Sequence, residues 1–495
     1  MRIICELKIF KILTSNYLLK SSGFFTVSQG IAAIVNFAIL ALYTKYLPPL
    51  EFGKIAMIWM FVLISSIVID SGMNTAFSIK FYKIDNKENA KHIYSIFAYY
   101  LIILVVLYVI FRIFPSFFLK VINVNIPTSG VNILFLLLLS MLIGNFYTNI
   151  LIVDKKPKEY FFIILIFNLV LIISSVIYLT VLKSGYFSYI YVYLISYIII
   201  SLIGLRFFLV SYKFSSIKII SIFSIRKLLK LGIPLVPNSL LLMLLTWADR
   251  YIINIYSGLA VVGIYTIGYR FSQIIDRFIV SSFGKALSPI LFQQFATSID
   301  EYKNTLSKLF KYYWIVILGI TITYFVILKE VFSLLISVKY VEGYNIIPVV
   351  LLGVVLWGIT NLLGVTLIMK EKTNKMFLFT FISVLLNIGL NFLLIPQYGM
   401  YGAAIATFIS YFIQFVLIFK YTQKLLKIDY DYGYTFMTIS ISLFFLGGVI
   451  FVSYLDFSPL LSMSIKAFIL SVFLFVSYKY MGIKKLILAV RDYQK

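Results

Sequence analysis

The stretch GIPLVPNSLLLMLLTWADRYIINIY, residues 232–256, combines an apolar run of lipid-spanning length with an internal charged pair, Asp249 and Arg250. An α-helix rises about 1.5 Å per residue, so roughly 20 mainly apolar residues cross the ~30 Å hydrocarbon core of a bilayer. A charged side chain at the centre of such a span costs about 2.5–3.5 kcal/mol on insertion scales, which makes it a functional candidate by default. The stretch therefore predicts a transmembrane helix that carries charge in its interior.

Similar apolar runs recur along all 495 residues. The chain is 62% hydrophobic and only 12% charged, whereas soluble domains are about half apolar and a quarter charged. The runs give about fourteen candidate spans, and the pieces between them are too short for a soluble domain of about 50 residues. The sequence therefore predicts an all-α integral membrane protein whose function lies within the membrane.

The distribution of Lys and Arg predicts the topology. Most of the 43 basic residues lie in alternate loops, for example at 80–91 and 370–375, and the positive-inside rule places those loops in the cytoplasm. An even number of spans then puts both termini in the cytoplasm. Because the net charge of +25 is accounted for by these scattered loops, we expect no nucleic-acid partner.

An internal repeat indicates two halves. LEFGKIAMIWMF (50–61) aligns with AVVGIYTIGYRF (260–271), with Gly53 on Gly263, and repeated halves are common in transporters. Between the halves, residues 212–231 alternate apolar and basic residues, which suits a helix on the anionic inner leaflet.

We therefore divide the chain into four parts. These are an N-lobe of spans one to six (1–211), a cytoplasmic amphipathic linker (212–231), a C-lobe of spans seven to twelve (232–427), and spans thirteen and fourteen with a cytoplasmic tail (428–495).

Charged residues concentrate in spans seven and eight. Arg250 lies in span seven, and Arg270 and Arg277 lie two helical turns apart on one face of span eight. Guanidinium groups stay charged and grip phosphate through paired hydrogen bonds, so one interpretation is a cationic cavity for an anionic headgroup. The alternative is that Asp249 or Asp276 neutralises an arginine on a neighbouring helix; these acids could instead bind a coupling proton or sodium ion.

Neutral polar side chains within the spans are a second set of candidates. They either line a hydrophilic path or make hydrogen bonds between helices, and the sequence favours neither. The set comprises Gln29, Asn36, Asn238, Asn387 and Asn391. Asp70, near the cytoplasmic end of span two, is interpreted as an interfacial residue.

The motifs that are missing limit the chemistry. The chain has one cysteine and one histidine, so we expect no metal site and no catalytic triad. It also lacks a GxxxxGK[ST] loop for ATP. We therefore expect a transporter without cofactors rather than an enzyme.

Three stretches resemble the Wzx-type polysaccharide flippase family, within the superfamily that includes multidrug and toxin extrusion (MATE) exporters and the lipid II flippase. The resemblance rests on a Pro-containing external turn, a Gly-Ile-Pro entry with Asp-Arg and Val-Gly-Ile-Tyr steps, and a Pro-x-x-Gly-x-x-Gly-Ala-Ala turn. The stretches are YTKYLPPLEFGKIAM (43–57), residues 228–271, and IPQYGMYGAAIATFISYF (395–412).

This resemblance implies a MATE-like fold of two pseudo-symmetric six-helix lobes plus two C-terminal helices. It implies alternating access around a cationic cavity in the bacterial cytoplasmic (inner) membrane. The implied substrate is an undecaprenyl-diphosphate-linked oligosaccharide repeat unit, moved from the inner to the outer leaflet for O-antigen or capsule synthesis. Implied partners are a polymerase, glycan assembly proteins and a proton or sodium gradient. Arg250, Arg270 and Arg277 would be the cationic residues.

Three alternatives stay open. A lipid II flippase would use the same arginines for its diphosphate. A multidrug exporter of the same superfamily is disfavoured for cationic drugs, because like charges oppose binding. An O-antigen polymerase is expected to carry a large external loop, whereas the external connections here are short.

Overall fold

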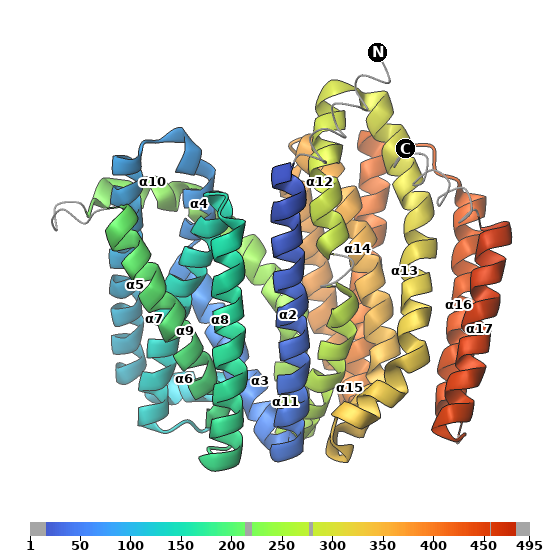
Figure 1. Cartoon of the computed structure of the whole chain (residues 1–495), viewed down its shortest axis with the longest axis horizontal. Helices are drawn as coiled ribbons and strands as arrows, with labels where there is room; N and C mark the ends of the chain where they lie inside the picture. Colours follow the sequence, from blue (N-terminus) through green and yellow to red (C-terminus); the bar gives the residue numbers. More distant parts are fainter. Residues whose placement is uncertain (1–15, 213–219, 277–280, 456, 482–495) are drawn as a thin grey trace. The chain divides into compact units, whose positions relative to one another are not determined.

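The computed structural model describes residues 16–212, 220–276, 281–455 and 457–481, and within them every regular element is helical. The prediction of an all-α membrane fold is confirmed (Figure 1). The long and intermediate helices are α2 (Asn16–Tyr46), α3 (Pro49–Asp70), α5 (Asn86–Ile113), α7 (Thr128–Val153), α8 (Pro157–Val176), α9 (Phe187–Ser211), α11 (Val236–Ile275), α12 (Ser281–Thr297), α13 (Ile299–Leu335), α14 (Ile347–Met369), α15 (Thr373–Leu425), α16 (Tyr432–Tyr454) and α17 (Pro459–Tyr480). Shorter helices are α4 (Met73–Lys80), α6 (Pro115–Ile122) and α10 (Ile222–Gly232).

Twelve segments of the described chain are long and apolar enough to cross a membrane. Two of them are interrupted by a glycine with non-helical backbone angles, at Gly258 in α11 and at Gly399 in α15. Both glycines have positive φ, which costs a residue without a Cβ little. Counting each interrupted helix as two segments reproduces the expected number of about fourteen.

Prolines and polar caps fix where the helices begin. Pro49, Pro157 and Pro459 stand in the first turn of α3, α8 and α17, where the missing N–H would have no partner in any case. Asp85 and Ser298 accept hydrogen bonds from the backbone at the start of α5 and α13, which satisfies otherwise orphaned donors. Short loops can therefore follow long apolar spans without leaving backbone groups unpaired.

The chain forms two compact units: unit 1 is Met1–Tyr251 with Leu259–Gly263, and unit 2 is Ile252–Gly258 with Ile264–Lys495. In unit 1, α7, α8 and α9 run side by side, and α8 also packs on α2 (Figure 1). In unit 2, α14 packs on α15, while α13 packs on the neighbouring helices α16 and α17.

The α10 helix has one buried face and one exposed face. Ser224, Leu228 and Gly232 are buried, and α10 contacts α4 and α5. Lys227 also binds Glu88 of α5, with 3.1 Å between Nζ and Oε1. On the opposite face Ile222, Phe223, Arg226 and Lys230 are exposed. Within the expected linker, 212–231, residues 213–219 lie outside the described part of the chain.

Glycines allow backbones to meet within unit 1. A Cβ on Gly53 of α3 would run into the carbonyl oxygen of Leu259, and one on Gly263 would run into that of Pro49. The two glycines that align in the internal repeat thus lie against each other's chain segments. In lipid no hydrophobic effect drives helices together, so this close approach stabilises the helix packing through van der Waals contact.

We predict that Gly53→Ala lowers the thermal midpoint of the detergent-solubilised protein. The added methyl must push the Leu259 backbone away, and overpacking of this kind costs about 1–3 kcal/mol. Gly447→Ala is the matched control, because nothing lies within 4 Å of its Cβ position. Equal midpoints for the two variants, measured by fluorescence-detected size exclusion after heating, would contradict the prediction.

Candidate functional site

Asp249 and Arg250 form an ion pair inside α11. Arg250 Nη1 lies 2.8 Å from Asp249 Oδ1 and donates to the Thr246 carbonyl oxygen at 2.6 Å. Its guanidinium carbon is 4.4 Å from the ring centre of Trp247, a cation–π distance. Both side chains are almost fully buried, with 2% and 1% exposed. The arginine therefore folds back along its own helix, where the adjacent carboxylate and the Thr246 carbonyl oxygen both accept hydrogen bonds from it.

The remaining predicted charges lie in or beside the second segment of α11. Arg270 and Asp276 are half-buried and belong to unit 2, whereas Asp249 and Arg250 belong to unit 1. Arg277 lies outside the described residues. The predicted roles of these residues, in anion binding, ion coupling or charge pairing, stay predictions.

The predicted polar residues of spans one and seven have different surroundings. Gln29 Nε2 approaches Tyr160 Oη of α8 at 3.4 Å. Asn36 Nδ2 donates to the carbonyl oxygen of Ala32, one turn earlier in α2, at 2.6 Å. Asn238 is half-buried in the first turn of α11.

Asn387 and Asn391 lie in a buried polar seam within unit 2. Both are fully buried, and Asn391 Nδ2 donates to Asn387 Oδ1 at 3.0 Å. Across the interruption at Gly399, Gln414 Nε2 of the second segment of α15 donates to Thr380 Oγ1 of the first at 3.2 Å, about two turns before Asn387. Within the described residues Asn387 Nδ2 and Asn391 Oδ1 have no hydrogen-bond partner.

Sequence reasoning found the two asparagines of this seam and missed the rest. Polar residues recur every three or four positions in α15, which puts them on one helix face. This spacing could have identified the missed residues. The missed buried residues are Thr380, Ser383, Thr407, Ser410 and Gln414.

Asp70, interpreted from the sequence as an interfacial residue, is held in place by hydrogen bonds from two helices. Its Oδ1 accepts hydrogen bonds from Tyr100 Oη of α5 at 2.5 Å and from the Asn74 backbone N–H at 3.3 Å, and Tyr100 is fully buried. The side chain of Asn74 is fixed in turn, because Asn149 Nδ2 of α7 donates to its Oδ1 at 2.5 Å. The carboxylate is therefore held by neighbouring helices of unit 1.

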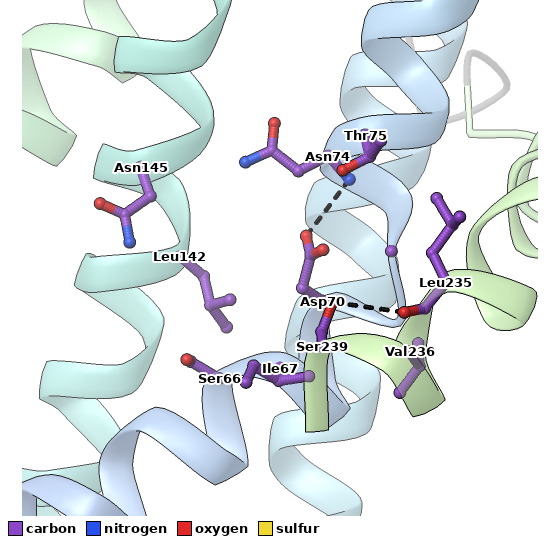
Figure 2. Close-up of a pocket in the computed structure, with 11 residues that line it drawn as sticks. Ser66, Ile67, Asp70, Asn74, Thr75, Leu142, Asn145, Leu235, Val236 and Ser239 are labelled. Atoms are coloured by element: carbon purple, nitrogen blue, oxygen red, sulfur yellow. Dashed lines mark hydrogen bonds between the residues drawn. The ribbon is translucent and has the colours of Figure 1, made fainter. Parts of the chain in front are cut away.

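This carboxylate lines a pocket of about 200 Å³. Figure 2 shows Asp70 and Asn74 on one side of the space, with Asn145 and Leu142 of α7 across from them. The first turn of α11 supplies another wall. It is held there because Gly232 and Gly72 meet backbone to backbone, with no room for a Cβ on either. Sequence reasoning missed this pocket because its residues come from four separate helices.

A larger, apolar groove lies in unit 2. Its volume is about 530 Å³, and side chains of α13, α14, α15 and α16 line it. Aromatic residues dominate the lining, among them Phe310, Trp314, Phe408, Phe412, Phe415 and Phe436. Such a surface suits a long hydrocarbon rather than a polar ligand.

A model of the polysaccharide biosynthesis protein family matches residues 18–295. The chain belongs to the polysaccharide biosynthesis protein family. Membership confirms the resemblance to Wzx-type flippases that the motifs predicted. A comparison with curated protein sequences gives no significant match.

Solved structures of one transporter superfamily share the fold. The lipid II flippase MurJ in an inward closed conformation has a TM-score of 0.69 at 18% identity, covering 93% of this chain and 99% of that one. An inward-facing multidrug resistance MATE family transporter of the MOP superfamily scores 0.64 at 13% identity, with 80% and 95% covered. A MOP superfamily transporter from Pyrococcus furiosus scores 0.56 at 14% identity, with 83% and 96% covered. The MATE-like fold is confirmed, and the chain is a multi-pass membrane protein.

We predict that removing one partner of the Asp249–Arg250 pair destabilises the protein more than removing both partners. Asp249→Ala leaves a buried guanidinium without its adjacent carboxylate, and breaking a buried pair costs about 3–5 kcal/mol. The double variant Asp249→Ala/Arg250→Ala removes both charges and is expected to melt at a higher temperature than Asp249→Ala. Thermal unfolding in detergent is the measurement.

The exposed pair Lys311–Asp431, 2.8 Å apart, provides the matched control. Exposed pairs contribute about 0–1 kcal/mol, so Lys311→Ala, which leaves Asp431 as the N-cap of α16, is expected to change the midpoint little. A double variant at 249 and 250 that melts no higher than Asp249→Ala would contradict this account of the pair.

Proposed function

We propose that the protein moves undecaprenyl-diphosphate-linked oligosaccharide repeat units from the inner to the outer leaflet of the bacterial cytoplasmic membrane. The glycan would serve O-antigen or capsular polysaccharide synthesis. The observation that carries the proposal is membership of the polysaccharide biosynthesis protein family in a chain built of membrane-spanning helices. A chain of this kind acts on the lipid-bound form of a glycan, because that form shares its membrane.

The apolar groove of unit 2 supports a substrate with a long hydrocarbon tail. Its lining joins Phe310 and Trp314 of α13 to Phe412 of α15 and Phe436 of α16. A polyprenyl chain is flexible and wholly apolar, so it gains from aromatic contact and needs no hydrogen bonds. We assign this groove to the lipid tail of the substrate.

The arginines support an anionic group at the other end of the substrate. In our proposal Arg250, Arg270 and Arg277 meet the diphosphate, since guanidinium binds phosphate through paired, charge-assisted hydrogen bonds. Asp249 and Asp276 balance these charges or bind a coupling ion. Gln29, Asn36 and Asn238 contribute polar surface, while the fully buried Asn387 and Asn391 serve in hydrogen bonding inside the bundle.

A lipid II flippase is the second candidate, favoured by the similarity of fold to MurJ over 93% of this chain. Lipid II also combines a polyprenyl tail with a diphosphate, so the groove and the arginines would serve it equally. The two candidates differ in the glycan that is lost when the gene is removed.

We predict that deleting the gene causes complete lipid-linked repeat units to accumulate while surface polysaccharide is lost. The measurement is extraction and analysis of undecaprenyl-diphosphate-linked sugars beside an assay of surface glycan, with the intact gene restoring both. A test for single units on the outer leaflet separates a flippase from a polymerase, because a missing polymerase leaves flipped single units there. Unchanged glycan with impaired cell-wall synthesis would favour lipid II instead.

Two sets of variants test the assigned residues in the same assay. Arg270→Ala/Arg277→Ala is expected to lower surface glycan at normal protein level, because the diphosphate loses two cationic partners. Phe412→Ser is expected to lower surface glycan severalfold, since a bound tail would cover Phe412, which is 45% exposed, and burying a Phe side chain contributes about 1.5–3 kcal/mol. Phe468→Ser is the control for Phe412→Ser. Phe468 is 69% exposed on α17 and lies outside the groove. Full glycan with both arginines replaced would remove the argument for a cationic site.

A further inference from the structure

The pocket at Asp70 has a lining that is half polar and half apolar. Ser66, Asp70, Thr75 and Asn145 supply hydroxyl, carboxylate and amide groups, and Ile67, Leu142, Leu235 and Val236 supply hydrocarbon. These residues come from α3, α4, α7, the short 3₁₀ turn Ile233–Leu235 and the start of α11, all within unit 1. The surface is therefore shaped by four chain segments and offers both kinds of contact.

The charge of the pocket rules out the anionic part of the proposed substrate. No Lys or Arg lies among its lining residues, and its one charged side chain is an acid. A phosphate brought next to Asp70 would meet a like charge in a partly desolvated site, which costs free energy. The diphosphate therefore belongs elsewhere.

The oxygen atoms of the pocket do not form a cage for a metal ion. Asp70 is its only carboxylate, and Asp70 Oδ1 already accepts from Tyr100 and from the Asn74 backbone. Hard cations take six or more oxygen ligands in proteins, and the described chain has no cluster of three His, Cys, Asp or Glu side chains. About half of the lining is apolar, which a cation does not need.

A sugar ring matches the same lining. Its hydroxyl groups donate to a carboxylate and both donate to and accept from an amide, while its C–H faces pack on aliphatic side chains. The volume of about 200 Å³ equals that of six or seven waters, at about 30 Å³ each. This is the scale of one sugar residue and excludes a whole oligosaccharide.

Resting on the proposed function, we propose that this pocket is a subsite for one neutral sugar residue of the transported glycan, with Asp70 and Asn145 accepting and donating its hydrogen bonds. Tyr100 and the Asn74 backbone hold the carboxylate, and Asn149 holds Asn74. The Gly72–Gly232 contact holds the fourth wall, so the subsite is built before the sugar arrives.

The pocket can be tested by protecting a thiol within it. Cys5 is the one cysteine of the chain, so Cys5→Ser with Thr75→Cys places a single thiol at an exposed residue that lines the pocket. The full-length protein in lipid nanodiscs is treated with a methanethiosulfonate reagent, and the labelling rate is measured. Cys5→Ser with Asn86→Cys is the matched control, since Asn86 is an exposed residue at the start of α5 and lies outside the pocket.

Three additions separate the possible ligands. Lipid-linked glycan extracted from the host cells is expected to slow labelling at position 75 and to leave position 86 unchanged. Synthetic undecaprenyl diphosphate without sugar is expected to protect neither position. Equal protection by the sugar-free lipid, or protection by sodium chloride but not choline chloride, would overturn the sugar assignment, as would the absence of any protection.

Variants of the pocket complete the test. Asp70→Ala is expected to weaken the protection about tenfold, because hydrogen bonds to charged groups are the stronger ones; Asp70→Asn should retain part of it, since an amide oxygen still accepts. If Asp70→Ala does not fold, Asn145→Ala serves in its place. Protection that survives in both alanine variants overturns the subsite. Normal glycan export in the absence of protection overturns the subsite alone, whereas export that is unaffected by gene deletion overturns the proposed function.

Discussion

The absence of water in the bilayer core is the constraint from which most of this structure follows. A polar group that leaves water without a partner costs several kcal/mol in hydrocarbon, so backbone and side chains must satisfy one another. The backbone does so in helices. Hydroxyl groups do so by donating a hydrogen bond to a carbonyl oxygen one turn earlier in the same helix, as Ser140 does to Leu136 and Thr321 to Ile317. Other polar side chains bond to a neighbouring helix instead, as Ser201 Oγ does to the Ser140 carbonyl oxygen, and such side chains also make up the Asp70 pocket and the α15 seam.

The same constraint explains the role of glycine. Lipid tails are as apolar as leucine, so helices associate through close contact and not by escaping water. Gly53 and Gly263 bring α3 against residues 259–263 of α11, and Gly72 and Gly232 bring the α3–α4 turn against the end of α10. The second of these contacts positions the first turn of α11 as a wall of the pocket, so helix packing and pocket shape depend on the same glycines.

The sequence predicted the spans well but not the contacts between distant segments, for physical reasons. Apolar runs near 20 residues can be read directly, because hydrophobic thickness sets their length. The kinks at Gly258 and Gly399 agree with the expected span boundaries. Contacts between distant segments leave no local pattern, however, and so the Asp70–Tyr100 bond was missed and Asp70 was interpreted as interfacial. Asp249 and Arg250 stand out in the sequence because they interrupt an apolar run. The sequence does not show the direction in which the arginine side chain folds.

The pairing of Asp249 with Arg250 bears on how an anion could be bound. A guanidinium buried without a partner would be costly, and the adjacent carboxylate lowers this cost. If Arg250 binds a diphosphate, as we propose, the substrate must replace Asp249 or share the guanidinium with it. Hydrogen bonds from guanidinium to carboxylate and to phosphate are of similar strength, so the exchange has a small net free energy. Small net binding is what a carrier needs, because a substrate held too tightly on one side of the membrane is not released on the other.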